Sequence, residues 1–287
     1  MVVSEVALAI GVELVLRRTG VSLAALLFYR SFFALLVLAA YVRPSRPEWT
    51  PQIPSLASLR VITGGMFYIG WFGSIGTVSA RVSAAILMLD SLLLALFRRE
   101  RRGYERGTIA VLAVSLVVFA GFAVREPGTV TNSSRGIIFL AIALVSRAAS
   151  YKVWERSQQR EEHLFWLIAP SLIGGTLGGL ALGRLHVDPL NVHTFAYVML
   201  LAVVGIIGYF YMNEVIRAVG AFYCRVIELW QVPVLWLLHL PLDRARPDLV
   251  QGTTSFLVAA ASAYAYYRYR QFPAAGNSSV RESSSRR

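Results

Sequence analysis

Long apolar runs follow one another along almost the whole 287-residue chain. Each run approaches the roughly 17–25 residues that an α-helix needs to cross a hydrocarbon core about 30 Å thick. Only helices and closed β-barrels can span lipid, and these runs are too long and too continuous for barrel strands. Charged residues make up 15% of the chain, against about 25% in soluble domains. The sequence therefore predicts an all-α integral membrane protein.

The apolar runs predict ten transmembrane helices. Their expected ranges are Val2–Leu16, Val21–Val42, Leu59–Ser79, Val82–Phe97, Gly107–Val124, Gly136–Val153, Leu164–Leu182, Thr194–Met212, Val219–Leu240 and Val250–Tyr267. The first run could be mistaken for a signal peptide. We expect it to be retained, because Glu5 stands where such a peptide carries Lys or Arg.

A short motif occurs twice at the same relative position. Ile69-Gly70-Trp71-Phe72 returns as Ile207-Gly208-Tyr209-Phe210, and the same offset without a gap aligns Asp90 with Glu228. An odd number of helices in each half inverts the second half relative to the first. The motif and the helix count together predict a 5+5 inverted-topology repeat, with a substrate site near the midplane where the repeats meet.

The repeat divides the chain into two similar halves. We expect five-helix units over residues 1–125 and 135–270, joined by a polar linker at 126–134. The small, polar and basic segment 271–287 is expected to be a disordered cytoplasmic tail.

The net charge of +12 comes almost entirely from arginine. Nucleic-acid binding is one explanation for such a charge, and the enrichment of basic residues in cytoplasmic loops is the other. The arginines are scattered over the ends of the spans, which favours the loop explanation and no nucleic-acid partner. If the N-terminus is cytoplasmic, roughly twice as many basic residues fall on the cytoplasmic side as on the other side. Arg60 is counted on the cytoplasmic side. We therefore predict that both termini are cytoplasmic.

Six ionisable residues fall inside the predicted spans, where charge is costly and usually functional. Glu13 lies in the first helix of the first half, and Arg147 lies in the first helix of the second half. The others are Arg30, Asp90, Arg225 and Glu228. Asp90 lies near the middle of its span. It is a candidate for binding and releasing protons, and the alternative is a static salt bridge to Arg30 that locks the helices together.

Glu228 follows Arg225 by three residues, so the two side chains share one helical face and can pair. The pair either neutralises itself for folding alone or presents charge to an ionic substrate. Trp71 and Tyr209 lie on the duplicated third and eighth helices. Aromatic side chains with one polar atom can line a cavity for amphipathic solutes, although packing against lipid is the alternative. The eight candidates for binding substrate or protons are Glu13, Arg30, Trp71, Asp90, Arg147, Tyr209, Arg225 and Glu228.

No motif of a soluble enzyme is present. The chain lacks HExxH, GxSxG, a Walker loop and CxxC, and its one cysteine, Cys224, can form neither an intrachain disulfide nor a metal site alone. We expect no cofactor and no metal. The alternative to a transporter is a membrane-embedded enzyme acting on a lipid or isoprenoid, with the same carboxylates as acid and base, or a scaffold that transports nothing.

Several short stretches, taken in order, resemble the EamA-type members of the drug/metabolite transporter superfamily. The stretches are Phe28-Tyr29-Arg30, Ser79 to Ala85, Glu100 followed by Gly107, Arg217 to Ala221, and Ile227-Glu228 through Pro233-Val234. The resemblance covers the chain to about Arg268. One departure stands in the fourth span, where Asp90-Ser91-Leu92 replaces the proline usual in the family.

The resemblance implies a multipass inner-membrane exporter or exchanger of a small amphipathic or charged metabolite. The central cavity of such proteins is lined by the first, third and fourth helices of each half, which implies a place there for Asp90 and Glu228. Because no ATP-binding motif is present, transport would draw on a gradient, with protons as the candidate coupling ion. The expected partners are the small-molecule substrate and the lipid bilayer, and a homodimer is left open.

Overall fold

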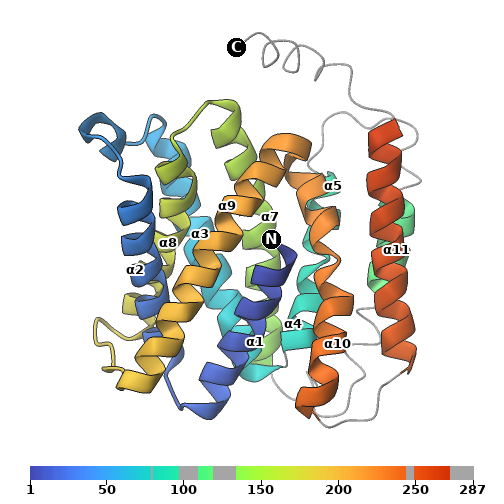
Figure 1. Cartoon of the computed structure of the whole chain (residues 1–287), viewed down its shortest axis with the longest axis horizontal. Coiled ribbons are helices and arrows are strands. Elements are labelled where there is room, and N and C mark those ends of the chain that lie inside the picture. The colour runs from blue at the N-terminus through green and yellow to red at the C-terminus, as the bar shows by residue number, and fades with distance from the viewer. Residues whose placement is uncertain (79, 97–108, 119–133, 244–248, 272–287) are drawn as a thin grey trace.

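The computed structural model describes residues 1–78, 80–96, 109–118, 134–243 and 249–271. Within these ranges all regular structure is helical, and the helices stand side by side as a bundle with α2 at one end and α11 at the other (Figure 1). The elements are α1 (Val2–Arg18), α2 (Leu23–Val42), the 3₁₀ helix η1 (Arg46–Trp49), α3 (Pro54–Thr77), α4 (Ala80–Leu87), α5 (Asp90–Leu96), α7 (Ser134–Gln159), α8 (Leu164–Leu182), α9 (Val192–Glu228), α10 (Gln231–Asp243) and α11 (Leu249–Gln271).

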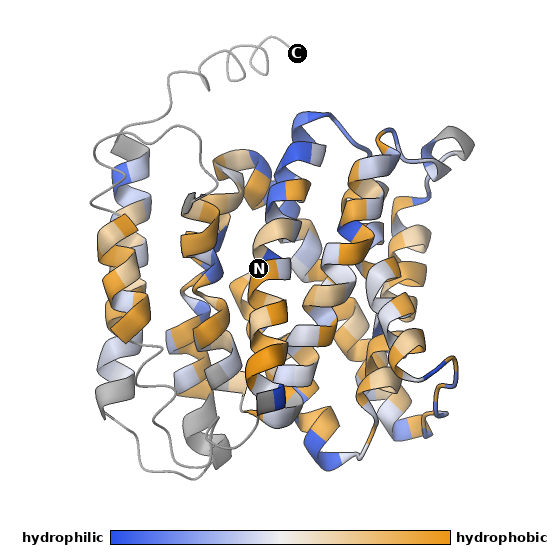
Figure 2. Ribbon diagram, turned by 180° about the vertical axis from the view of Figure 1, so that it is seen from behind, coloured by the Kyte–Doolittle hydropathy of each residue, from blue (hydrophilic) through white to orange (hydrophobic). Residues whose placement is uncertain are grey.

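The described part of the chain has the composition of a membrane bundle. Four helical stretches are long and apolar enough to cross a bilayer, namely Leu23–Val42, Arg135–Gln159, Leu164–Leu182 and Val192–Leu238. Large apolar side chains such as Ile62, Val114 and Val145 are more than 60% exposed, whereas Arg30, Asp90 and Arg225 are fully buried. Figure 2 shows apolar residues along the lengths of the helices and hydrophilic ones gathered toward their ends. A surface of this kind suits lipid better than water.

The helix contacts come in reciprocal pairs. α3 packs along α7, and α1 packs along α9; α3 also packs on α8, and α2 packs on α9. α5 also packs on α7, and α10 packs on α1. α2 and α8, the second helix of each half, pack on each other. The contacts of α1, α2 and α3 with α7, α8 and α9 thus recur with the members of each pair exchanged.

Glycines bring α3 and α8 into close contact. A Cβ atom added to Gly174 would lie 2.0 Å from the carbonyl oxygen of Val61, and one added to Gly65 would lie 2.7 Å from the carbonyl oxygen of Gly174. Small residues at such crossings let backbones approach and gain van der Waals contact. This crossing holds α3 in place, and α3 carries one wall of the cavity described below.

The helices differ from the ten predicted spans in three places. The predicted fourth span is interrupted at Met88–Leu89, between α4 and α5. The predicted eighth and ninth spans continue into each other as α9, with a kink at Gly220 (φ 81°, ψ 167°), and the chain breaks again at Leu229–Trp230. Of the predicted fifth span, the described part is the helix Ile109–Val118. The seventh span agrees with α8 at both ends.

The kink and the second break have identifiable causes. Gly220 adopts a positive φ that L side chains rarely take, so the helix direction changes there without strain. Pro233 has no N–H to donate to the carbonyl of Leu229, and the N–H of Val232 bonds that carbonyl instead. The predicted loop Arg98–Arg106, the basic tail from residue 272 and all but the last residue of the predicted linker lie outside the described residues.

Candidate functional site

Four charged side chains meet in the interior of the bundle. Asp90 begins α5, Arg147 lies on α7, and Arg225 and Glu228 lie in the last turn of α9. All four are at most 3% exposed. The Nη2 atom of Arg225 lies 2.9 Å from Oδ1 of Asp90, and its Nη1 contacts the Glu228 carboxylate one turn further along α9. Arg225 thereby joins the two acids.

Arg147 forms the second bridge of the cluster. Its Nη2 lies 2.6 Å from the Glu5 carboxylate on α1 and 3.3 Å from that of Glu228, and its Nε lies 3.6 Å from Asp90. Tyr151, one turn further along α7, donates its hydroxyl to Oε1 of Glu228 at 2.6 Å. Elements from both halves of the chain therefore share one hydrogen-bonded network.

Two helix breaks bring the acids of this cluster to helix ends. At Met88–Leu89 the helix tightens, with the N–H of Ser91 donating to the carbonyl of Met88. At Leu229–Trp230 the N–H of Trp230 donates to the carbonyl of Ile227 in the same i to i−3 manner. Bonds of this kind mark 3₁₀-like turns within helical segments, which often occur at hinges.

The cluster (Glu5, Asp90, Arg147, Arg225 and Glu228) contains three carboxylates and two guanidinium groups. With every group ionised it carries one net negative charge inside the protein. Uncompensated buried charge is strongly unfavourable. Taken without the nearby α-amino group of Met1, which interacts electrostatically with Glu5, these five side chains reach zero net charge when one carboxylate is protonated.

A small cavity lies beside this cluster. Side chains from α1, α2, α3, α7, α8 and α9 line it, including Glu5, Arg30, Trp71, Arg147 and Tyr209. Its volume is about 50 Å³. One buried water needs roughly 10–15 Å³, so the cavity has room for a few waters and not for a metabolite. In this structure the walls therefore leave too little room for a metabolite.

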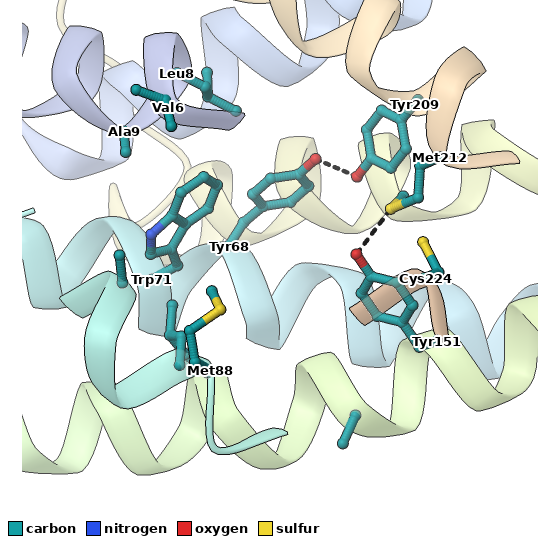
Figure 3. Packing of buried hydrophobic residues seen from close by; sticks show 14 of the residues in the cluster. Val6, Leu8, Ala9, Tyr68, Trp71, Met88, Tyr151, Tyr209, Met212 and Cys224 are labelled. Atoms are coloured by element: carbon teal, nitrogen blue, oxygen red, sulfur yellow. Dashed lines mark hydrogen bonds between the residues drawn. The ribbon is translucent and has the colours of Figure 1, made fainter. Parts of the chain in front are cut away.

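Aromatic side chains form much of the cavity wall. Tyr68 on α3 and Tyr209 on α9 point toward each other and join their hydroxyls in a hydrogen bond across the cavity (Figure 3). The indole of Trp71 stacks on Phe67, with ring centroids 5.3 Å apart. The hydroxyl of Tyr151 lies 2.9 Å from the sulfur of Met212, on the same side as Cys224 in Figure 3. Such a wall suits the apolar part of a solute.

The structure brings most of the eight predicted residues together. Arg30, Trp71, Arg147 and Tyr209 line the cavity. Asp90, Arg225 and Glu228 adjoin Arg147 in the charged cluster. Glu13 is placed elsewhere on α1, where its carboxylate accepts the backbone N–H of Ala80 and pairs with Arg17.

Two interpretations of the sequence were wrong. Asp90 pairs with Arg225 and Arg147, not with Arg30, because the break at Met88–Leu89 turns it toward α7 and α9. Arg60 is not a loop charge. It is fully buried on α3, where it donates to the carbonyl of Leu167 and to Ser171 and lies 4.2 Å from the Trp154 ring.

Three residues of the site were missed by sequence reasoning. Glu5 lies only three residues after the start of α1 and was considered only as an argument against a signal peptide. Tyr151 follows Arg147 by four residues, a spacing that puts both on one helical face and could have pointed to it. Tyr68 immediately precedes the repeated motif at Ile69. Neither tyrosine is charged, so the search for ionisable groups in spans passed over both.

Comparisons with known proteins identify a fold and no family. No protein-family model and no curated protein matches the chain. Twenty-six chains of solved structures are similar to it. One, described only as "Crystal structure of protein", aligns with a TM-score of 0.66 at 16% identity, over 95% of this chain and 97% of that one. At this identity the likeness shows a shared fold alone.

Proposed function

We propose that this protein is a secondary transporter with ten transmembrane helices in a 5+5 inverted repeat, which moves a small amphipathic or charged metabolite by alternating access. The reciprocal packing carries this proposal: α3 on α7 corresponds to α1 on α9, and α3 on α8 corresponds to α2 on α9. Two copies of one unit, related by an axis in the membrane plane, produce such an exchange. In this arrangement the closed cavity opens to one side and then to the other.

Discontinuous helices at the meeting point of the halves support the same function. The breaks at Met88–Leu89 and Leu229–Trp230 lie next to Asp90 and Glu228, in corresponding helices of the two halves. Transporters with inverted repeats use broken helices near the midplane to bind substrates and coupling ions. The order of these features also matches the EamA-type drug/metabolite transporters, and membership of that superfamily, an inner-membrane location and cytoplasmic termini are part of the proposal.

The charged cluster supplies a site for the coupling ion. Glu5, Asp90 and Glu228 share two arginines, so one proton neutralises the set. The carboxylate of Glu5 lines the cavity and is 18% exposed, which gives the proton a route to the solute pathway. Loading and releasing this proton would change the balance of contacts between α1, α5, α7 and α9, the helices that move relative to one another in the proposed cycle.

Transport into proteoliposomes tests the function against its alternatives. A panel of labelled carboxylates, amines, sugars and amino acids is offered with an inward or outward pH gradient. We expect the pH gradient to drive uptake of at least one class of compound by the wild-type protein. In Asp90→Asn and Glu228→Gln the gradient should no longer affect uptake, measured per amount of inserted protein. Arg156→Gln, a change on an exposed part of α7, serves as the control.

A parallel assay offers lipids and isoprenoid substrates to the detergent-purified protein. Product formation without any uptake would favour a membrane-embedded enzyme and contradict the proposal. If both neutral variants retain a wild-type response to pH gradients between about pH 5.5 and 8, the acids have a structural role and no role in coupling.

A further inference from the structure

Arg30 is a buried cation without a counter-ion among the described residues. It is 0% exposed on α2, and none of its three guanidinium nitrogens has a hydrogen-bond partner among the described residues. Arginine stays protonated in proteins, so this group keeps its charge. A buried charge is strongly unfavourable unless it is paired or hydrogen-bonded. The position is therefore suited to an anion that the described part of the chain does not itself provide.

The surroundings of Arg30 hold the guanidinium without neutralising it. Its Cζ atom lies 4.6 Å from the ring centroid of Tyr68 and 5.9 Å from that of Phe72, both within cation–π range. On the other side, a Cβ atom added to Gly205 would lie 2.2 Å from Nη2 of Arg30. The glycine leaves the space that the guanidinium occupies. The nitrogens of Arg30 remain free to donate to a ligand.

The lining of the cavity determines the charge of that ligand. Arg30 and Arg147 are the arginines among the described lining residues. Arg147 already contacts Glu5, Asp90 and Glu228, so it is compensated. Arg30 is the arginine of this lining that contacts no carboxylate of the described residues, and one guanidinium matches a monoanion rather than a dianion. A planar carboxylate also suits the paired donors of a guanidinium.

The remaining walls determine the body of the ligand. Phe67, Trp71, Trp154 and Tyr209 line the same cavity as Arg30. Trp154 and Tyr209 lie with their ring centroids 5.5 Å apart. Aromatic faces accept flat apolar groups, and a few convergent polar groups fix their orientation. The lining thus combines one anion-binding end with an apolar wall.

We propose that this cavity binds an amphipathic organic monocarboxylate, with its carboxylate on Arg30 and its apolar body between the aromatic walls. The inference rests on the proposed function, since the ligand would be the transported solute. At about 50 Å³ the closed cavity holds no such molecule. The ligand therefore enters when α3 and α9 separate, which breaks the hydrogen bond between Tyr68 and Tyr209.

Equilibrium binding tests the site without requiring transport. The quenching of tryptophan fluorescence, to which Trp71 and Trp154 contribute, is measured on the full chain in detergent. The probes are 3-phenylpropionate, its neutral analogue 3-phenylpropionamide, the cation 3-phenylpropylamine and the dianion phenyl phosphate. We expect the acid to bind roughly tenfold or more tightly than the amide, because a charge-assisted hydrogen bond is lost with the amide. The amine and the phosphate should bind less tightly than the acid.

Two variants remove the anion site in different ways. Arg30→Gln removes the charge. Gly205→Ala places a methyl group where Nη2 now lies, and the flexible end of Arg30 can move aside without unfolding the helix. Both should reduce the preference for acid over amide to less than threefold while amide binding persists. Arg156→Gln is the control, since Arg156 is exposed on α7 and does not line the cavity.

The outcomes separate this inference from the transport proposal. Failure of the wild-type protein to bind the acid, equal binding of acid and amide, or a preference that survives both variants would overturn the anion site. Acid binding that depends on Arg30 without any uptake into proteoliposomes would leave the site intact and contradict the transporter. Uptake of amines that is unaffected by Arg30→Gln would support the transporter and contradict the anion site.

Discussion

Arg225 on α9 places a guanidinium nitrogen 2.9 Å from the carboxylate of Asp90 on α5, across 135 residues of sequence. Both side chains are fully buried. The ion pair therefore connects the broken helix of the first half to the broken helix of the second. The charged cluster therefore forms only when α5 and α9 pack together.

This pair should behave as a coupled unit. Asp90→Asn leaves Arg225 with one carboxylate fewer in a buried site, and Arg225→Gln leaves Asp90 dependent on Arg147. We expect Arg225→Gln to lower the free energy of unfolding by about 3 kcal/mol, because it leaves three carboxylates on Arg147. Asp90→Asn should lower it by less, because two carboxylates and two guanidinium groups remain. The double variant should be no less stable than Arg225→Gln alone, because Asp90 no longer adds a buried charge without its partner.

Chemical unfolding in detergent micelles, followed by circular dichroism, measures the four proteins of this cycle. Glu214→Gln provides a matched control, since its contact with Arg217 is exposed and should contribute little. Additive losses in the double variant would contradict the pairing.

The two cavity tyrosines form a second coupled pair. Tyr68→Phe or Tyr209→Phe leaves one buried hydroxyl without its partner, which should lower stability by about 1–2 kcal/mol. When both hydroxyls are removed, the loss of stability should be smaller than in either single variant, because no hydroxyl is left without a partner. The same unfolding assay applies, with exposed Tyr211→Phe as the control. Independent effects at the two positions would show that the hydroxyls do not meet in solution.

The crossing of α3 and α8 should tolerate no added methyl group. In Gly174→Ala the new Cβ meets the backbone carbonyl of Val61, which cannot move aside as a side-chain end can. We expect a loss of about 1–3 kcal/mol from overpacking. Gly208→Ala is the control, because its Cβ would meet only the Ser4 side chain at 3.0 Å. The melting temperatures of the two variants, measured side by side, check this; equal values would mean that the helices do not approach so closely.

The sequence was sufficient to predict the helical class and many of the residues that meet inside. Span length and low charge content predicted a membrane bundle, and the cost of charge in lipid pointed to Arg30, Asp90, Arg147, Arg225 and Glu228. Pro233 can be read from the sequence as a residue without an N–H to donate, and the break at Leu229–Trp230 lies one turn before it. These signals are local, so they can be read without knowing which helices touch.

The partners of those residues could not be predicted in the same way. Nothing near Asp90 in sequence marks the break at Met88–Leu89, since neither proline nor glycine occurs there. Without that break, Arg30 was as reasonable a partner as Arg225. The ungapped repeat aligns Asp90 with Glu228; in the structure Asp90 follows its break as the first residue of α5, and Glu228 precedes its break as the last residue of α9. Arg60 looked like a loop charge because α3 begins at Pro54, earlier than hydropathy alone suggests.

Alternating access is tested most directly by labelling the cavity from each side of the membrane. Ser150 lines the cavity and is 8% exposed, so a Ser150→Cys protein with Cys224→Ala provides one reporter thiol. A membrane-impermeant maleimide is applied to right-side-out and to inverted vesicles, with buried Ser157→Cys in the same background as the control. We expect the Ser150→Cys thiol to react from both sides and the Ser157→Cys thiol to react from neither. Reaction of the Ser150→Cys thiol from one side only, or from neither, would contradict alternating access through this cavity.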